Sequence, residues 1–186
     1  MPTIDLSYPI GKFLKPMTID AAARARFVDQ IAETPALIRQ AVEHLNDRQL
    51  DTPYRPGGWT IRQVVHHVPD SHLNAYIRFK FALTEEEPVI KPYNEADWAR
   101  LPEALGGPIH YSLDLLQSLH ERWVACIRQL TADRFKRTFR HPEIGIVTLD
   151  EQLAMYAWHG QHHTAHITSL AAREGWVHVH GSHDSA

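Results

Sequence analysis

The sequence contains four long segments in which apolar residues recur every three or four positions. This spacing places the apolar residues on one face of an α-helix, and that face must be buried against other helices. The segments cover residues 18–45, 60–84, 112–130 and 148–174, and loops with proline and glycine, such as 46–58, separate them. Because no set of segments alternates in the manner of paired strands, we expect an all-α protein folded as a four-helix bundle.

Local signals predict where these helices begin. Thr18 or Asp20 is expected to cap the first helix, since both side chains can accept a hydrogen bond from the first turn. Thr60 is expected to cap the second helix and Ser112 the third. The fourth starts at Thr148-Leu149-Asp150-Glu151, where a threonine followed three residues later by an acid predicts a capping box.

Two prolines fall inside the expected helices. Pro35 removes one backbone hydrogen bond and is expected to kink or restart the first helix, with Thr34 as a local cap. Pro69 is expected to bend the second helix, which ends at the charged run 85–88. Gly175 is expected to stop the last helix.

The remaining segments are expected to lack long regular structure. Residues 1–16 contain prolines and a glycine, and they are expected to form an extended arm over the bundle. The connection 88–111, between the second and third helices, is long and is expected to carry one short helix at 95–101. Residues 137–147 are expected to form a loop or a small hairpin, and 177–186 a polar, flexible C-terminal tail.

Charge and composition argue against several classes of partner. The net charge is −3, whereas nucleic acids and anionic membranes usually require a basic patch. No apolar run approaches the roughly 20 residues of a membrane span, and the N-terminus lacks the pattern of a signal peptide. Cys126 is the only cysteine and lies in an apolar helical pattern, so we expect a buried thiol in a reducing compartment. A single cytoplasmic domain over residues 1–176, with no nucleic-acid or membrane partner, is therefore expected.

Histidine is the unusual component, with 14 residues, four of which lie between Tyr156 and Ile167. In a helix, His159 and His163 stand one turn apart, and His162 and His166 form a second such pair. Side chains four residues apart have Cβ atoms about 5–6 Å apart, so two imidazoles can reach one metal ion. The apolar stripe of this helix favours the pair His159 and His163 and leaves the other pair open.

The second helix offers His66, His67 and His72 as a third ligand. His67 lies three residues after Val64 and beside Val68, so its side chain points near the buried stripe. The alternative is that His67 is a core histidine, hydrogen-bonded to a neighbouring helix.

A site made of His67, His159 and His163 would have three neutral imidazoles and an open position. This is the pattern of catalytic zinc, in which water or substrate takes the fourth position. The same ligands also suit nickel, iron or cobalt.

Five separated motifs resemble one known family. They are LSYPIG at 6–11, GGWTIRQVVHH at 57–67, DSH at 70–72, YIRFK at 76–80 and WHGQHHTAHI at 158–167. In this order they resemble the DinB-like superfamily, and specifically its YfiT group, over residues 6–176.

The resemblance implies an up-down-down-up four-helix bundle that forms homodimers and binds one divalent ion, zinc or nickel. It implies that the ligands are one histidine of the second helix, here His67, and an H-x3-H pair, here His159 and His163. Pro69, two residues after His67, departs from the small helix-forming residue expected at this place in relatives.

The resemblance also implies an activity. Relatives in this group are similar to thiol S-transferases, which join a low-molecular-weight thiol such as bacillithiol to an electrophile. A metal ion would bind that thiol and hold it as the nucleophilic thiolate. Arg62, Arg78 or Lys80 could then meet carboxylates of the thiol, the alternative being surface salt bridges.

Two other functions remain open. Family members have also been labelled metal-dependent hydrolases, in which the metal activates water. No general base is evident for this reaction, since Asp70 could equally orient a histidine. The last hypothesis is a non-catalytic helical binding or stress-response module whose histidines are core residues.

Overall fold

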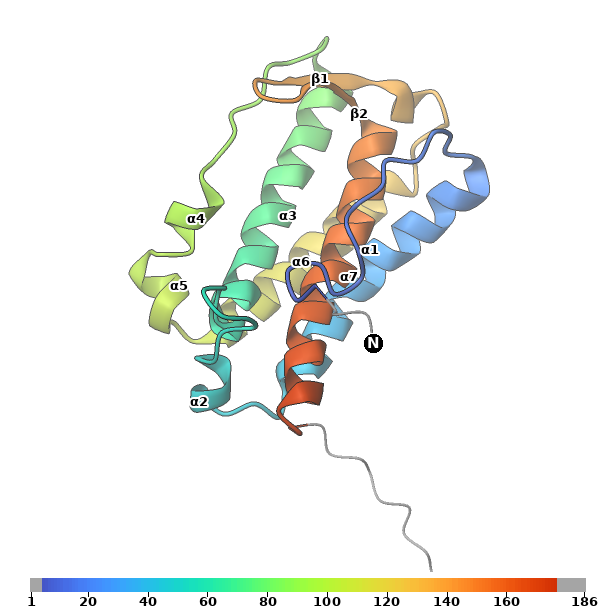
Figure 1. Cartoon of the computed structure of the whole chain (residues 1–186). Helices are drawn as coiled ribbons and strands as arrows, with labels where there is room; N and C mark the ends of the chain where they lie inside the picture. Colours follow the sequence, from blue (N-terminus) through green and yellow to red (C-terminus); the bar gives the residue numbers. More distant parts are fainter. Residues whose placement is uncertain (1–4, 177–186) are drawn as a thin grey trace, which may run out of the picture.

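The computed structural model describes residues 5–176, so the tail expected at 177–186 lies outside the described residues. Four long helices make the bundle: α1 (Ala21–Val42), α3 (Ile61–Thr84), α6 (Ile109–Ile127) and α7 (Leu149–Arg173). In Figure 1, α3 and α6 run in one direction and α1 and α7 in the other. The expected up-down-down-up four-helix bundle is therefore confirmed.

Short elements complete the described part of the chain. They are α2 (Asp47–Leu50), α4 (Glu95–Trp98), α5 (Pro102–Gly106), the 3-10 helix η1 (Arg134–Lys136), β1 (Thr138–His141) and β2 (Gly145–Thr148). The strands β1 and β2 pair as an antiparallel hairpin, which settles the alternative left open by the sequence. The hairpin lies at the end of the bundle where α3 finishes and α7 begins (Figure 1).

Most helix ends follow the expected signals. Asp20, rather than Thr18, caps α1 by accepting a hydrogen bond from the amide of Ala23. Thr60 caps α3 and Thr148 caps α7, each within a complete capping box. Gly175 follows α7 with a φ of 68°, a left-handed conformation that glycine adopts without strain.

Four expectations about the elements were wrong. The first helix does not restart at Pro35, and Thr34 is not a cap, because its hydroxyl donates to the carbonyl of Gln30 inside a continuous α1. Ser112 does not start the third helix. Pro108 precedes its first residue, Ile109, since the fixed φ of proline suits a helix start.

The other two concern the loops. The loop 46–58 contains α2, which Asn46 and Gln49 stabilise by a capping box. The single helix expected at 95–101 is two helices, α4 and α5, because Pro102 begins a new helical turn.

The N-terminal arm runs along α7. Ser7 contacts His166, Phe13 packs on Trp158 with ring centroids 5.9 Å apart, and Lys15 pairs with Glu151 at 2.7 Å. The arm and α7 are thus antiparallel, and the arm covers the surface of the helix that carries the histidine cluster. No helix within residues 5–176 is both long and apolar enough to cross a bilayer.

A polar layer divides the interior of the bundle. Phe79, Trp123 and Leu149 belong to one apolar cluster, near the hairpin, and Ile38, Leu116 and Ile167 to another, at the opposite end. Along each long helix, one or two buried polar residues fall between the residues of the two clusters. They are Thr34 on α1, His72 on α3, His120 on α6, and His163 with the half-buried His159 on α7.

Gly160 allows α7 to approach α1 at this polar layer. A Cβ atom added to Gly160 would lie 2.4 Å from Oγ1 and 2.8 Å from Cγ2 of Thr34, well inside van der Waals contact. Thr34 is fully buried and branched at Cβ, so its side chain has little freedom to move away.

We expect Gly160→Ala to lower the free energy of unfolding. Overpacking costs about 1–3 kcal/mol, and a contact this short belongs at the upper end, above the roughly 1 kcal/mol that alanine gains in helix propensity. Urea unfolding measures the change. Gly106→Ala is the matched control, because nothing lies within 4 Å of the added Cβ there. Equal stability of the Gly160→Ala and wild-type chains would contradict the close approach.

Candidate metal centre

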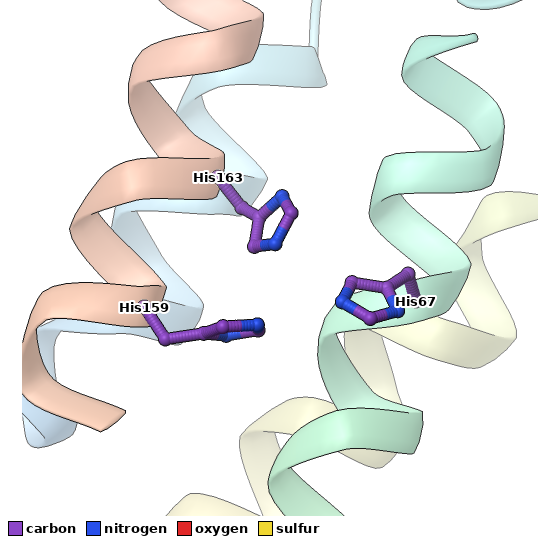
Figure 2. A group of neighbouring side chains, drawn as sticks. All are labelled: His67, His159 and His163. Carbon is purple, nitrogen blue, oxygen red and sulfur yellow. The ribbon is translucent and has the colours of Figure 1, made fainter. Parts of the chain in front are cut away.

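The three histidines chosen from the sequence come together between two antiparallel helices. Figure 2 shows the rings of His159 and His163, from α7, facing the ring of His67, from α3. One ring nitrogen of each lies within 4.8 Å of the other two. Two nitrogens bound to one zinc ion at about 2.1 Å are about 3–4 Å apart, so small ring rotations would close the site. Among residues 5–176, this is the only such group of three histidine, cysteine or acidic side chains.

The second pair of α7 lies elsewhere. His162 is stacked on Trp158, with ring centroids 4.3 Å apart, and His166 on Tyr54, at 3.9 Å. His66, the other candidate on α3, lies 2.7 Å from the hydroxyl of Ser112 through Nδ1. None of these three histidines belongs to the group of three.

A chain of hydrogen-bonded imidazoles fixes the orientation of His159. Nδ1 of His120 lies 2.6 Å from the carbonyl oxygen of Ile31, and because a carbonyl only accepts, this nitrogen carries the proton. Nε2 of His120 therefore accepts from Nδ1 of His72, at 2.8 Å. Nε2 of His72 in turn accepts from Nδ1 of His159, at 3.1 Å. The lone pair of His159 is thus on Nε2, free for a metal ion.

Pro35 explains why a helix carbonyl is available to begin this chain. In a regular α-helix the carbonyl of Ile31 would accept from the amide four residues later, at position 35. Proline has no amide hydrogen, so that bond is absent and the Nδ1–H of His120 takes its place. The proline inside α1 thus supplies the anchor of the chain.

A second, shorter chain orients His163. Nε2 of His166 lies 3.2 Å from the carbonyl oxygen of Ser7 in the arm and donates to it. Nδ1 of His166 then accepts from Nδ1 of His163, at 3.4 Å. This leaves the lone pair of His163 on Nε2, as in His159. Metal-bound histidines are commonly held through the second ring nitrogen in this manner.

Burial keeps the three rings neutral. It lowers the pKa of His67 to about 4, with the nearby His162 and His166 as further causes. Burial, followed by the neighbouring imidazoles, also lowers the pKa values of His159 and His163 well below the usual range. At neutral pH all three present lone pairs, which metal coordination requires.

The three rings line one cavity of about 670 Å³. Trp59 lies beside His67, with ring centroids 4.7 Å apart, and Tyr156 lines the wall on α7. Arg78 also lines this cavity, whereas Arg62 forms ion pairs with Asp47 and Asp51. Lys80 is exposed and lies over the ring of Tyr76. Of the three cations considered from the sequence, only Arg78 can meet a ligand in this cavity.

Sequence reasoning missed the residues that orient the ligands. Asp70, considered for that role, has no hydrogen bond to an imidazole within residues 5–176, and burial raises its pKa to about 6. The role falls to His72, His120 and His166. The position of His120, four residues after Leu116 and three before Trp123 on the apolar face of α6, was the available signal.

Comparison with known proteins identifies the family. Residues 30–167 match the family model of the DinB superfamily. The chain belongs to the DinB superfamily. It is 50% identical over 177 residues to "Putative metal-dependent hydrolase YfiT" of Bacillus subtilis, covering 95% of this chain and 99% of the relative. A second relative with the name "Putative metal-dependent hydrolase", from Oceanobacillus iheyensis, is 49% identical over 169 residues, covering 91% of this chain and 98% of the relative.

Solved structures support the same assignment. The structure of Bacillus subtilis YfiT, described as "a probable metal-dependent hydrolase with an unusual four-helix bundle topology", matches with a TM-score of 0.91 at 50% identity. The match covers 94% of this chain and all of that chain. TT2238, another four-helix bundle protein, shares the fold alone, with a TM-score of 0.53 at 18% identity over 80% of this chain.

We expect His72→Phe to weaken metal binding by about 10–100-fold, because His159 loses the acceptor that orients it. Competition with a chromogenic chelator measures the affinity for zinc, and circular dichroism verifies folding. His66→Phe is the matched control, a buried histidine of the same helix with no bond to the candidate ligands. Equal affinities of the two variants would contradict the orienting role of His72.

Proposed function

We propose that this protein is a metal-dependent enzyme whose ion is held by His67, His159 and His163. The observation that carries the proposal is the convergence of three neutral imidazoles, with their lone pairs available, on the wall of a large cavity. The names of the relatives, as metal-dependent hydrolases, support the same general class.

Three protein ligands fit a catalytic rather than a purely structural ion, because structural zinc sites usually have four. A divalent ion bound there, zinc or nickel and one per chain, would act as a Lewis acid that lowers the pKa of a nucleophile from the cavity. The protein's own part is to keep the ligands neutral and oriented, through the chains that end at Ile31 and Ser7.

We further propose that the nucleophile is a low-molecular-weight thiol of the bacillithiol type, and that the reaction is its transfer to an electrophile. The resemblance to the YfiT group supports this reaction. A cavity of about 670 Å³ is within the range that accommodates a drug-sized ligand, and a thiol held as thiolate needs no general base.

Hydrolysis is the second candidate, and the names of the relatives favour it. Water would then be the nucleophile, and the two glutamates that line the cavity, Glu95 and Glu143, are the carboxylates available to handle its proton.

The setting of the enzyme is also part of the proposal. We propose a single domain over residues 1–176 that works as a homodimer in the cytoplasm. The lone cysteine, Cys126, and the family resemblance support these assignments.

The first test is metal content per chain, measured by mass spectrometry on a full-length chain whose tail histidines, His178, His180 and His183, are replaced by serine. We expect about one zinc or nickel ion per chain. The variants His67→Ala, His159→Ala and His163→Ala should lose it, because two imidazoles alone hold an ion poorly. His162→Ala is the control and should retain it. Chains that contain no metal in any preparation would favour a non-catalytic binding module.

The second test separates the two reactions. The metal-loaded protein is incubated with an electrophile such as 1-chloro-2,4-dinitrobenzene, with and without bacillithiol, cysteine or coenzyme A. We expect metal-dependent formation of the thiol adduct, which the His163→Ala variant does not catalyse. Failure with every thiol, together with metal-dependent hydrolysis of ester or amide substrates in the absence of thiol, would establish the hydrolase instead.

A further inference from the structure

A second cavity adjoins the metal cavity on its hairpin side. It has a volume of about 370 Å³ and lies between α3, α7, the hairpin and the arm. Arg78, His141, Met155 and Tyr156 line both cavities, so these residues form the junction. The other walls are largely apolar, with Phe13 from the arm and Phe139, Ile144, Ile146 and Val147 from the hairpin region. We call this space the hairpin cavity.

Hydrogen-bond donors at and near the junction have no partner within the described chain. Arg78 makes no hydrogen bond or ion pair with any residue in 5–176, although its side chain is half-buried. Gln152 is only 5% exposed, and its Nε2 atom is buried without a hydrogen bond. Unpaired buried donors are costly, and at the wall of a cavity they indicate an acceptor that arrives with a ligand.

His141 provides a third donor. Its Nδ1 accepts from the amide of Glu143 at 3.2 Å, so the proton of the neutral ring is on Nε2. Burial and the charge of Arg78 both lower the pKa of His141, which favours this neutral form, while Glu143 acts in the opposite direction. Within the part of the chain that the structure describes, Nε2 has no partner either.

The charges around the junction favour an anion. In the hairpin cavity, Lys15 and Glu151 neutralise one another at 2.7 Å. In the metal cavity, Arg55 and Arg78 balance Glu95 and Glu143, and neither glutamate forms an ion pair with Arg78 among the described residues. A divalent ion on the three histidines would therefore leave an excess of positive charge.

We propose that Arg78, His141 and Gln152 bind a carboxylate of the substrate, and that the hairpin cavity holds an apolar group next to it. One guanidinium with two neutral donors suits a monoanion, since the planar guanidinium pairs with a carboxylate through two parallel hydrogen bonds. This inference rests on the proposed function only for the part of the substrate that reacts at the metal.

The helices set the distance between the two ends of the site. Gln152 precedes His159 by seven residues on α7, which is two turns or about 10 Å. Arg78 follows His67 by eleven residues on α3, which is three turns or about 16 Å between Cα atoms, before the length of the arginine side chain is subtracted. Because α3 and α7 are antiparallel, both displacements point towards the hairpin. The substrate's carboxylate thus lies about 10 Å from its reacting group.

The test is a binding comparison between 3-phenylpropionate and its neutral amide, made by isothermal titration calorimetry on the full-length chain with and without bound zinc. We expect the wild-type chain to prefer the carboxylate by at least about tenfold, with and without zinc, since hydrogen bonds to charged groups are the stronger ones. Arg78→Met should bring the ratio of the two affinities close to one, and Arg78→Lys should restore part of it. Gln152→Met should reduce it less, because the lost donor is neutral.

Arg122→Met is the matched control. Arg122 is exposed on α6 and lines neither cavity, so this variant has the same net charge as Arg78→Met but should keep the wild-type preference. Acetate, which lacks the apolar group, should bind at least about tenfold more weakly than 3-phenylpropionate.

Three results would overturn the proposal. They are the absence of binding of 3-phenylpropionate to the wild-type chain, a carboxylate preference that persists in Arg78→Met, and a preference that disappears when zinc is removed. In the last case the carboxylate sits on the metal rather than on Arg78. Because the comparison is also made without metal, a protein that fails to bind zinc would refute the proposed function and leave this result intact.

Discussion

A chain of buried hydrogen bonds from the carbonyl of Ile31 through His120 and His72 to His159 determines how the four helices meet. The chain takes one member from each of the four long helices, so every bond depends on the register of two helices. A buried imidazole without its partner would cost roughly 1–3 kcal/mol, which penalises any sliding of one helix along another. The polar layer therefore specifies a unique packing of a bundle whose apolar clusters alone would tolerate several.

The same chain explains features that seem unfavourable when taken singly. A proline in the middle of α1 removes a helix hydrogen bond, but at position 35 it frees the carbonyl that anchors His120. A glycine in the middle of α7 weakens the helix, but at position 160 it admits Thr34 and brings α1 close to the histidine layer. Local cost at these two positions is offset by the geometry of the site.

The site itself is asymmetric along the bundle axis. At its centre, His67, His159 and His163 offer three neutral nitrogens, and the arm completes their support through the carbonyl of Ser7. Towards the hairpin, the donors of Arg78 and Gln152 lie beside apolar walls. A substrate is thus expected to lie along the groove between α3 and α7, with its reacting group at the histidines and its carboxylate at the hairpin end.

The sequence by itself determined much of this protein. The period of apolar residues predicted four long helices, and short-range capping signals at Thr60, Thr148 and Gly175 located helix ends, because both depend on residues within one or two turns. Spacing on one helix also suggested His159 with His163. Signals of this range failed at Ser112, whose hydroxyl bonds to His66 on another helix rather than capping its own.

Only the tertiary structure decided which histidines face one another and which orient them. His72 and His120 are 48 residues apart, and Ser7 and His166 are 159 apart, so no local pattern could pair them. The consequence of Pro35 likewise depends on a donor from α6. The unpaired donors of Arg78 and Gln152 became visible once the hairpin had closed over the end of the bundle, because the absence of a partner is a property of the folded chain and not of any segment.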